Sequence, residues 1–342
     1  MAKDKQRHIL IIRLSALGDI AISVPLIKEY ARNNPQIKFS VLSQPSTSPL
    51  FEGVDNLHFI PFDLPKDKRG IFDVLRFTSD SLLPLQITDV ADIHNVIRTK
   101  IIRGRLRLNG IRCMAIDKGR KGKKALVREK NKILVQQKSS MRRYEEVFAA
   151  LGLNDLNFAN NNNRPETKRN AAEKESSLIG IAPFAQHKGK CWPLEYVEEA
   201  IKLLTANPNN KIILFGGGKK EVEILEAIAA KYPNTESAAG KYKMKQEQEL
   251  MRSLSVMVSM DSANMHLASL VDTPVVSIWG ATHPFAGFYG WRQAPENALQ
   301  TNLACRPCSI YGNKPCMRGD YACLYGIKPQ QLVDKITEII RH

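Results

Sequence analysis

The sequence predicts an α/β protein made of two doubly wound halves. Short apolar runs alternate with longer segments of helical pattern, and this alternation favours parallel sheets covered by helices on both faces. A polar stretch at residues 160–177, rich in Asn with alternating Lys and Glu, interrupts the rhythm, which then restarts. A chain of 342 residues is also long enough for two domains of about 100–200 residues each.

The first half begins with a buried-type strand at residues 9–12 and a turn at 13–19. A helix follows over 20–32 and ends at Asn33-Asn34-Pro35. Further strands are expected at 38–42, 57–61 and 87–93. In the second half, strands are expected at 178–182, 211–215, 256–259 and 275–279, and helices at 193–207, 219–231, 247–254, 261–270 and 329–341.

These elements divide the chain into an N-terminal domain at residues 1–165, a linker at 166–177 and a C-terminal domain at 178–328. A cysteine-rich segment at 303–324 belongs to the C-terminal domain. Ligands of open parallel sheets bind beyond the carboxyl ends of the strands. A cleft between the two domains is therefore the expected place for a site.

The composition, 43% hydrophobic and 25% charged, is that of a globular protein with a core. The sequence has no apolar run near the ~18 residues of a spanning helix, and the run at 9–12 is too short for a signal peptide. We therefore expect a cytoplasmic protein.

The chain carries a net charge of +16, and cationic residues crowd between Arg98 and Arg143, where only Asp117 and Glu129 oppose them. Such a block favours an anionic partner, namely a phosphorylated substrate, a nucleic acid or an anionic membrane, and a solvated basic face is the alternative. A specific nucleic-acid-binding protein is disfavoured, because the sequence has no helix-turn-helix, zinc-finger or RNP-type signature.

Two turns after predicted strands carry charged side chains. In the turn at 13–19, Gly18 permits a close approach, and Asp19 fits either a helix N-cap or a general base that faces the cleft. The loop at 182–193 contains Lys188 and Lys190, which suit phosphate oxygens, and a solvated loop is the alternative.

A third turn, at 215–218, is rich in glycine but lacks the spacing of a dinucleotide fingerprint or a Walker loop. An NAD-dependent oxidoreductase is therefore disfavoured. Gly216 and Gly217 would admit a nucleoside beside Met244, and Glu221 would accept hydrogen bonds from ribose hydroxyls. A carboxylate in the first turn of a helix is equally compatible with the helix dipole alone.

A fourth turn opens a helix with small polar residues. The backbone N–H groups of Ser262, Ala263 and Asn264 would point outward and bind an anion. Asp261 would either cap this helix or contact sugar hydroxyls. His266 lies one turn further on, where a lone histidine is most often structural and a donor contact is the alternative.

Four cysteines, Cys305, Cys308, Cys316 and Cys323, lie within the cysteine-rich segment. In a cytoplasmic protein, such a group favours a small metal knot over disulfides. The spacing is not that of a standard zinc ribbon, so a structural zinc ion and four reduced thiols both stay open. The sequence has no His, Asp and Glu cluster that indicates a catalytic metal.

Together, these turns resemble those of the bacterial heptosyltransferases, glycosyltransferase family 9, which build the inner core of lipopolysaccharide. ILIIRLSALGDIAISVP at 9–25 is similar to the family's opening strand, S-x-x-G-D turn and helix. KCWP at 190–193 matches K-x-W-P, SMDSANMHLA at 259–268 is similar to D-[ST]-G-x-x-H-x-A, and GATHP at 280–284 is similar to G-P-T-D-P.

The resemblance implies a GT-B fold, in which two Rossmann-like domains face each other across a cleft, and a last helix at 329–342 that packs back toward the N-terminal domain. It implies inverting, metal-independent transfer of a heptose from ADP-heptose to a lipopolysaccharide core acceptor of the lipid A-Kdo type, with no cofactor required for catalysis. The implied location is cytoplasmic and peripheral on the anionic inner face of the inner membrane, and no specific nucleic acid is implied as a partner.

By resemblance, Asp19 is the general base for the acceptor hydroxyl, and Lys190 neutralises the departing diphosphate. The implied donor contacts are Lys188, Asp261, Ser262, Ala263, Asn264 and His266, with the nucleoside at Gly216, Gly217, Glu221 and Met244. The implied acceptor contacts are Ser15, Gly18, Arg120, Lys123 and Lys124, and the basic block would bind the anionic membrane surface.

The sequence also departs from the family pattern. Phe184 and Ala263 stand where the family usually has Gly, and Ala281 and His283 replace Pro and Asp of G-P-T-D-P. Side chains at 184 and 263 would narrow the nucleotide pocket. A GT-B transferase that uses a different nucleotide sugar for another surface glycan is therefore the alternative.

Overall fold

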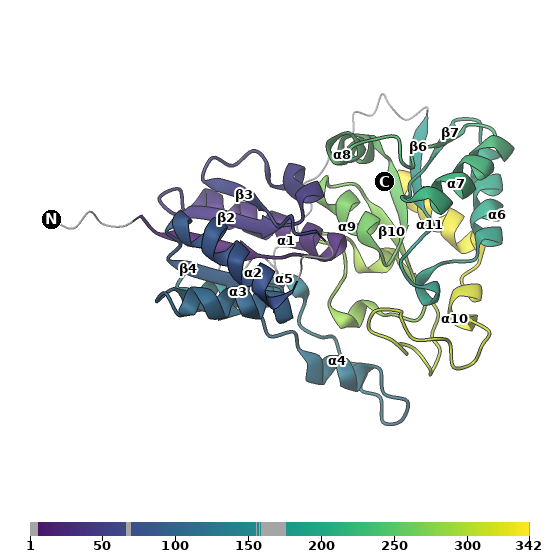
Figure 1. Ribbon diagram of the computed structural model, residues 1–342. Helices are drawn as coiled ribbons and strands as arrows, with labels where there is room; N and C mark the ends of the chain where they lie inside the picture. Colours follow the sequence, from purple (N-terminus) through teal and green to yellow (C-terminus); the bar gives the residue numbers. More distant parts are fainter. Residues whose placement is uncertain (1–5, 66–69, 155, 157, 159–175, 342) are drawn as a thin grey trace. The chain divides into compact units, whose positions relative to one another are not determined.

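The computed structural model describes residues 6–65, 70–154, 156, 158 and 176–341. The chain divides into two compact units (Figure 1). One contains residues 1–118 and 140–161, and the other contains residues 119–139 and 162–342. We call these unit 1 and unit 2.

The described residues of unit 1 form a five-stranded parallel sheet in the order β3-β2-β1-β4-β5. Its strands are β1 (His8–Ile12), β2 (Lys38–Ser43), β3 (Leu57–Pro61), β4 (Asp89–Asp92) and β5 (Arg112–Ala115). Its α-helices are α1 (Leu17–Asn33), α2 (Ile71–Phe77), α3 (Ile97–Arg107) and α5 (Ser140–Ala150).

Helices cover both faces of this sheet because its central strand is apolar on both sides. Successive side chains of a strand point to opposite faces, and the side chains of residues 9–12 are all fully buried. Leu10 and Ile12 pack with residues of α2 and α3 in one core cluster. Ile9 and Ile11 face the other side, where α1 and α5 pack together (Figure 1).

The described residues of unit 2 form a six-stranded parallel sheet in the order β11-β10-β9-β6-β7-β8. The strands are β6 (Ser177–Ala182), β7 (Asn210–Leu214), β8 (Thr235–Ser237), β9 (Val256–Met260), β10 (Val275–Trp279) and β11 (Ala298–Gln300). The α-helices are α4 (Arg120–Leu126), α6 (Leu194–Thr205), α7 (Lys219–Lys231), α8 (Met244–Ser253), α9 (Ala263–Leu270), α10 (Ala322–Tyr325) and α11 (Pro329–Arg341).

One core cluster joins α6, α7 and α11 to the inner strands of this sheet, and Figure 1 shows these helices on the face opposite to α8 and α9. α11 packs against α6 and contributes Leu332 and Ile336 to this core. Its expected return toward the N-terminal domain stays a prediction.

Both sheets have the strand order of a Rossmann fold, which confirms the predicted pair of doubly wound domains. In such a sheet the strand order reverses at a switch point, and ligands bind beyond the carboxyl ends of the two strands beside it. These strands are β1 and β4 in unit 1, and β6 and β9 in unit 2.

Residues 119–139, which we call the strap, lie within the expected N-terminal domain but group with unit 2. The Lys132 ammonium donates to the carbonyl oxygens of Ala304, Cys305 and Pro307 at 3.1, 2.7 and 3.1 Å. The Gln137 N–H donates to the Phe285 carbonyl oxygen at 2.8 Å. The expected boundary at 165 and nearly all of the expected linker at 166–177 lie outside the described residues.

Across the described residues, no helix is both long enough and apolar enough to span a bilayer.

Candidate active site

The switch point of unit 2 brings a lysine and an aspartate together. Lys190 ends the short 3-10 helix at Lys188–Lys190 in the loop after β6, and Asp261 directly follows β9. The Lys190 Nζ atom lies 3.1 Å from the Asp261 Oδ2 atom, and the two side chains are 15% and 6% exposed. The adjacent strands β6 and β9 thus place a shielded ion pair at the carboxyl edge of the sheet.

The helix α9 begins beside this ion pair. Its N-cap is Ser262, whose side chain makes no capping hydrogen bond and whose Oγ atom lies 3.2 Å from that of Ser259. Of the two roles expected for Asp261, the helix cap is therefore wrong, because Ser262 holds that position. Ala263 and Asn264 are half-buried in the first turn, where backbone N–H groups and the helix dipole favour an anion.

The cysteine-rich segment packs against the loop that carries the lysines. Gly312 has φ +75°, and a Cβ atom there would lie only 2.4 Å from Lys190 Cγ. Lys188 Nζ lies 5.0 Å from the centroid of the Tyr321 ring, which is within the range of a cation–π contact. The cysteine-rich segment therefore contacts both lysines that were predicted to bind the diphosphate.

The glycine-rich turn after β7 is closed by Glu221. The Gly217 N–H donates to Glu221 Oε2 at 2.8 Å, and Gly218, at φ +85°, is the N-cap of α7. Met244 is half-buried at the start of α8, and His266 is buried in α9. The nucleoside and donor roles of these residues stay predictions.

In unit 1, Asp19 is the third residue of α1, and Ala16 is the N-cap. The N-cap role considered for Asp19 is therefore wrong. Its carboxylate forms an ion pair with the guanidinium of Arg13, and the two side chains are 34% and 7% exposed. Asp19 is thus oriented by a buried cation while its carboxylate stays accessible to a ligand.

Two further side chains at this switch point were not predicted as site residues. The Arg13 guanidinium donates to the Ile93 carbonyl oxygen at 2.8 Å, and the Leu14 N–H donates to His94 Nδ1 at 3.3 Å. Burial, and then the positive charge of Arg13, lower the pKa of His94 to about 3. His94 is therefore neutral near pH 7, with its proton on Nε2. The signal that identifies it is its place directly after the strand predicted at 87–93.

The expected acceptor contacts are divided between the two units. Ser15 and Gly18 belong to unit 1, whereas Arg120, Lys123 and Lys124 belong to the strap in unit 2. Arg120 and Lys124 are exposed, but Lys123 is buried, with its Nζ atom 4.2 Å from the centroid of the Phe288 ring.

The basic block at 98–143 is not a continuous cationic face. Arg103 Nε lies 2.7 Å from the buried Asp92 carboxylate, and Arg112 lies 2.7 Å from that of Asp89. Part of the positive charge of the block therefore neutralises buried carboxylates of unit 1.

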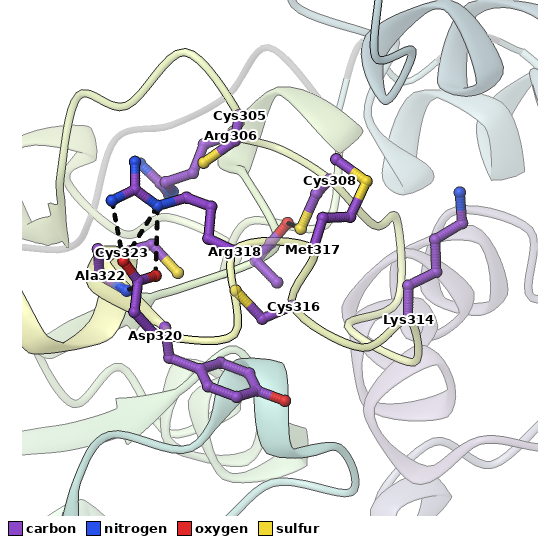
Figure 2. A pocket seen from close by; sticks show the side chains of 12 residues that line it. Cys305, Arg306, Cys308, Lys314, Cys316, Met317, Arg318, Asp320, Ala322 and Cys323 are labelled. Atoms are coloured by element: carbon purple, nitrogen blue, oxygen red, sulfur yellow. Dashed lines mark hydrogen bonds and ion pairs between the residues drawn. The ribbon is translucent and has the colours of Figure 1, made fainter.

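The four cysteines of the cysteine-rich segment line one pocket, together with Arg306 and Asp320 (Figure 2). All four are free thiols. Burial raises the pKa of Cys308 and also that of Cys323, which reaches about 11. Within the described ranges, no three His, Cys, Asp or Glu side chains are grouped closely enough to hold a metal ion as they stand.

Three of the residues that depart from the family pattern make defined contacts in unit 2. The Phe184 side chain packs against the core of unit 2. The Ala281 N–H donates to the Gly189 carbonyl oxygen at 2.8 Å, a bond that the proline usual at this position has no N–H to make. His283 Nδ1 accepts from the Phe285 N–H at 3.1 Å. Ala281 thus ties the G-A-T-H-P turn to the loop of Lys190.

Two Rossmann-type units, with a lysine–aspartate pair at one switch point and an arginine–aspartate pair at the other, have the GT-B fold of solved heptosyltransferases. The model of the family "Glycosyltransferase family 9 (heptosyltransferase)" matches residues 109–316. The chain belongs to this family, as its turns predicted.

Among curated relatives, the chain is 24% identical over 303 residues to lipopolysaccharide heptosyltransferase 3 of Escherichia coli, covering 83% of this chain and 84% of that protein. It is 22% identical over 311 residues to the lipopolysaccharide core heptosyltransferase OpsX of Haemophilus influenzae, covering 86% and 83%. Among solved structures, a family 9 glycosyltransferase of Veillonella parvula has a TM-score of 0.72 at 16% identity, covering 99% and 98%. The E. coli ADP-heptose lps heptosyltransferase II has a TM-score of 0.67 at 18% identity, covering 98% of both chains.

Proposed function

We propose that the chain transfers a heptose from ADP-heptose to a lipopolysaccharide core acceptor of the lipid A-Kdo type, with inversion at the anomeric carbon and without a catalytic metal. The observation that carries this proposal is the Lys190–Asp261 pair beside the first turn of α9. A similar structure, E. coli heptosyltransferase WaaC, was solved with ADP-2-deoxy-2-fluoro heptose, which supports ADP-heptose as the donor.

In the proposed reaction, the Asp19 carboxylate takes the proton of the acceptor hydroxyl. The oxygen attacks the anomeric carbon from the face opposite to the diphosphate, a new C–O bond forms, and the bond to the diphosphate breaks. Lys190 and the N–H groups of Ser262, Ala263 and Asn264 stabilise the charge that develops on the departing ADP. Asp261 holds the sugar hydroxyls once the donor draws Lys190 away.

The strap supports a peripheral contact with an anionic membrane. Ile133, Leu134 and Val135 are 49%, 51% and 57% exposed. Exposed cations, including Arg120 and Lys124, lie on the same segment. Apolar side chains among cations suit the interface of an anionic leaflet, which we propose as the surface where the glycolipid acceptor is met.

The test is a thermal-shift titration of the full chain with ADP, ADP-heptose, UDP, GDP and CMP, followed by mass spectrometry of a lipid A-Kdo acceptor. A ligand at about 100 times its Kd raises the free energy of unfolding by ~2.7 kcal/mol. We expect stabilisation by ADP and ADP-heptose alone and an acceptor heavier by one heptosyl group. Stabilisation by another nucleotide, with no heptosyl product, would replace this proposal with a transferase for a different nucleotide sugar.

A further inference from the structure

The cysteine-rich segment brings together four side chains of one chemical kind. Cys305 and Cys308 lie in the loop after β11, Cys316 lies in the next turn, and Cys323 lies in α10. Figure 2 shows all four around one pocket. Asp320 also lines it, and the Arg318 guanidinium holds this carboxylate at 2.8 Å.

Two cations lie against the same segment, and among the described residues no carboxylate forms an ion pair with either. Arg306 is 4% exposed, and its guanidinium donates to the carbonyl oxygens of Trp279, Gly280, Thr282 and Thr301 and to the amide oxygen of Gln300. Lys132 donates to three carbonyl oxygens of this segment. A charge as buried as that of Arg306 is costly unless an opposite charge lies near it, whereas Lys132 is half-buried.

We propose that Cys305, Cys308, Cys316 and Cys323 bind one thiophilic divalent metal ion, zinc or iron, in a structural site. Four thiolates around a divalent ion leave a net negative charge, which is the counter-charge that Arg306 and Lys132 lack. Because no three of the thiols are grouped closely enough as they stand, binding draws the sulfurs inward around the pocket and releases their protons.

The metal site would also position Lys188 and Lys190 in the loop after β6. Cys308 N–H and Ser309 N–H both donate to the Ala281 carbonyl oxygen, at 3.1 and 3.2 Å, and Ala281 in turn bonds to Gly189 between the two lysines. Gly312 and Tyr321, which contact Lys190 and Lys188, lie between the same cysteines in the sequence. This consequence rests on the proposed function, whereas the metal site does not.

The first experiment is elemental analysis of the full chain purified without added metal. We expect a single zinc or iron ion per chain in the wild type and in Cys113→Ser, whose thiol lies in unit 1, and loss of that ion in Cys308→Ser and Cys316→Ser. A metal-free wild-type protein that does not bind added Zn²⁺, or an ion that persists in both cysteine variants, would overturn the proposal.

A second measurement uses the wild type alone, so it does not depend on the folding of the variants. After chelation, Co²⁺ should give a thiolate-to-metal charge-transfer band, and Zn²⁺ should bleach it and protect the four thiols from alkylation. Disulfides among these cysteines in the native protein, or alkylation unchanged by Zn²⁺, would refute the site. The stabilisation that ADP gives to the metal-free and the metal-loaded chain then separates the two proposals. If the chain binds a metal ion but ADP does not stabilise it, only the proposed donor role is refuted.

Discussion

The ammonium group of Lys190 lies 3.1 Å from the carboxylate of Asp261, and this contact joins the carboxyl ends of the two strands beside the switch point of unit 2. Each residue is the counter-charge of the other while the donor is absent. In the proposed reaction, a diphosphate bound at α9 would compete with Asp261 for Lys190. On that proposal, the ion pair holds Lys190 near the place where negative charge would develop.

Lys190→Ala should lower kcat/KM by about 10²–10³-fold, because one preorganised group that stabilises the departing charge is lost. It should also leave Asp261, which is 6% exposed at its side chain, without its cation. A double-mutant cycle with Asp261→Asn should give a coupling energy of about 0.5–3 kcal/mol in urea unfolding. Additive effects would show that the pair does not contribute to stability. Lys202→Ala, at an exposed position, is the control.

Asp19→Asn should lower kcat by about 10²–10⁴-fold, the usual contribution of a general base. Since Asp19 lies in unit 1 and the predicted donor contacts lie in unit 2, stabilisation by ADP should not change. Kinetics and thermal shift on the same preparation check both statements. Asp55→Asn, an exposed position of unit 1, should keep full activity. A variant at position 19 with wild-type kcat would remove Asp19 from the mechanism.

Stability should fall with acidification through the titration of His94. Its pKa is lowered in the folded chain from 6.5 to about 3, so between these values the unfolded chain binds the extra proton and unfolding is favoured as the pH falls. At about pH 5 the loss is roughly 2 kcal/mol relative to neutral pH. His94→Asn keeps an acceptor for the Leu14 N–H but does not titrate, so its urea midpoint should depend less on pH. Equal slopes would contradict this assignment.

Gly312→Ala should weaken ADP binding, because the added Cβ atom would lie 2.4 Å from Lys190 Cγ. Gly319→Ala is a matched control in the same segment: its φ is +76°, close to the +75° of Gly312, but a Cβ atom there meets nothing within 4 Å. Both variants should lose about 1–2 kcal/mol of stability to backbone strain. Calorimetry should find a loss of ADP affinity for the change at 312 alone, and equal losses would show that the contact with Lys190 has no effect.

Reversal of two charges on the strap, in Arg120→Glu/Lys124→Glu, should weaken binding to anionic phospholipid vesicles. Each cation near such a surface contributes about 1 kcal/mol, so the partition constant should fall about tenfold or more. Lys202→Glu/Lys211→Glu changes the net charge equally at exposed positions elsewhere in unit 2. Cosedimentation at low salt checks the difference, and an equal loss in both variants would indicate a response to net charge only.

Regular elements with a strong apolar pattern were predictable from the sequence. The predicted bounds of β3, β10, α7 and α11 coincide with those of the structure. The short edge strands β8 and β11 were missed, because the residues at 235–237 and 298–300 form no apolar run and join the sheet through backbone pairing. α1 begins at Leu17 rather than at residue 20, since Gly18 and Asp19 have the composition of a turn but lie in the helix.

The candidate site was predictable where it depends on motifs that end a strand, as with Lys190 and Asp261. It was not predictable where it depends on pairing between distant residues. The sequence does not tell an arginine that serves a buried carboxylate, as Arg103 serves Asp92, from one that faces solvent. Likewise, the sequence does not show that the ammonium of Lys123 lies over the ring of Phe288.

The strap fixes an order of events during synthesis. Lys132 bonds to the carbonyl oxygen of Cys305, which follows it by 173 residues. At about 5–20 residues per second, the ribosome needs roughly 10–35 s to make the intervening chain. Until the cysteine-rich segment emerges, the Lys132 ammonium of the nascent strap therefore lacks the carbonyl oxygens of Ala304, Cys305 and Pro307. A C-terminal fragment that begins at residue 162 would lack the strap altogether and would need it supplied as a separate peptide.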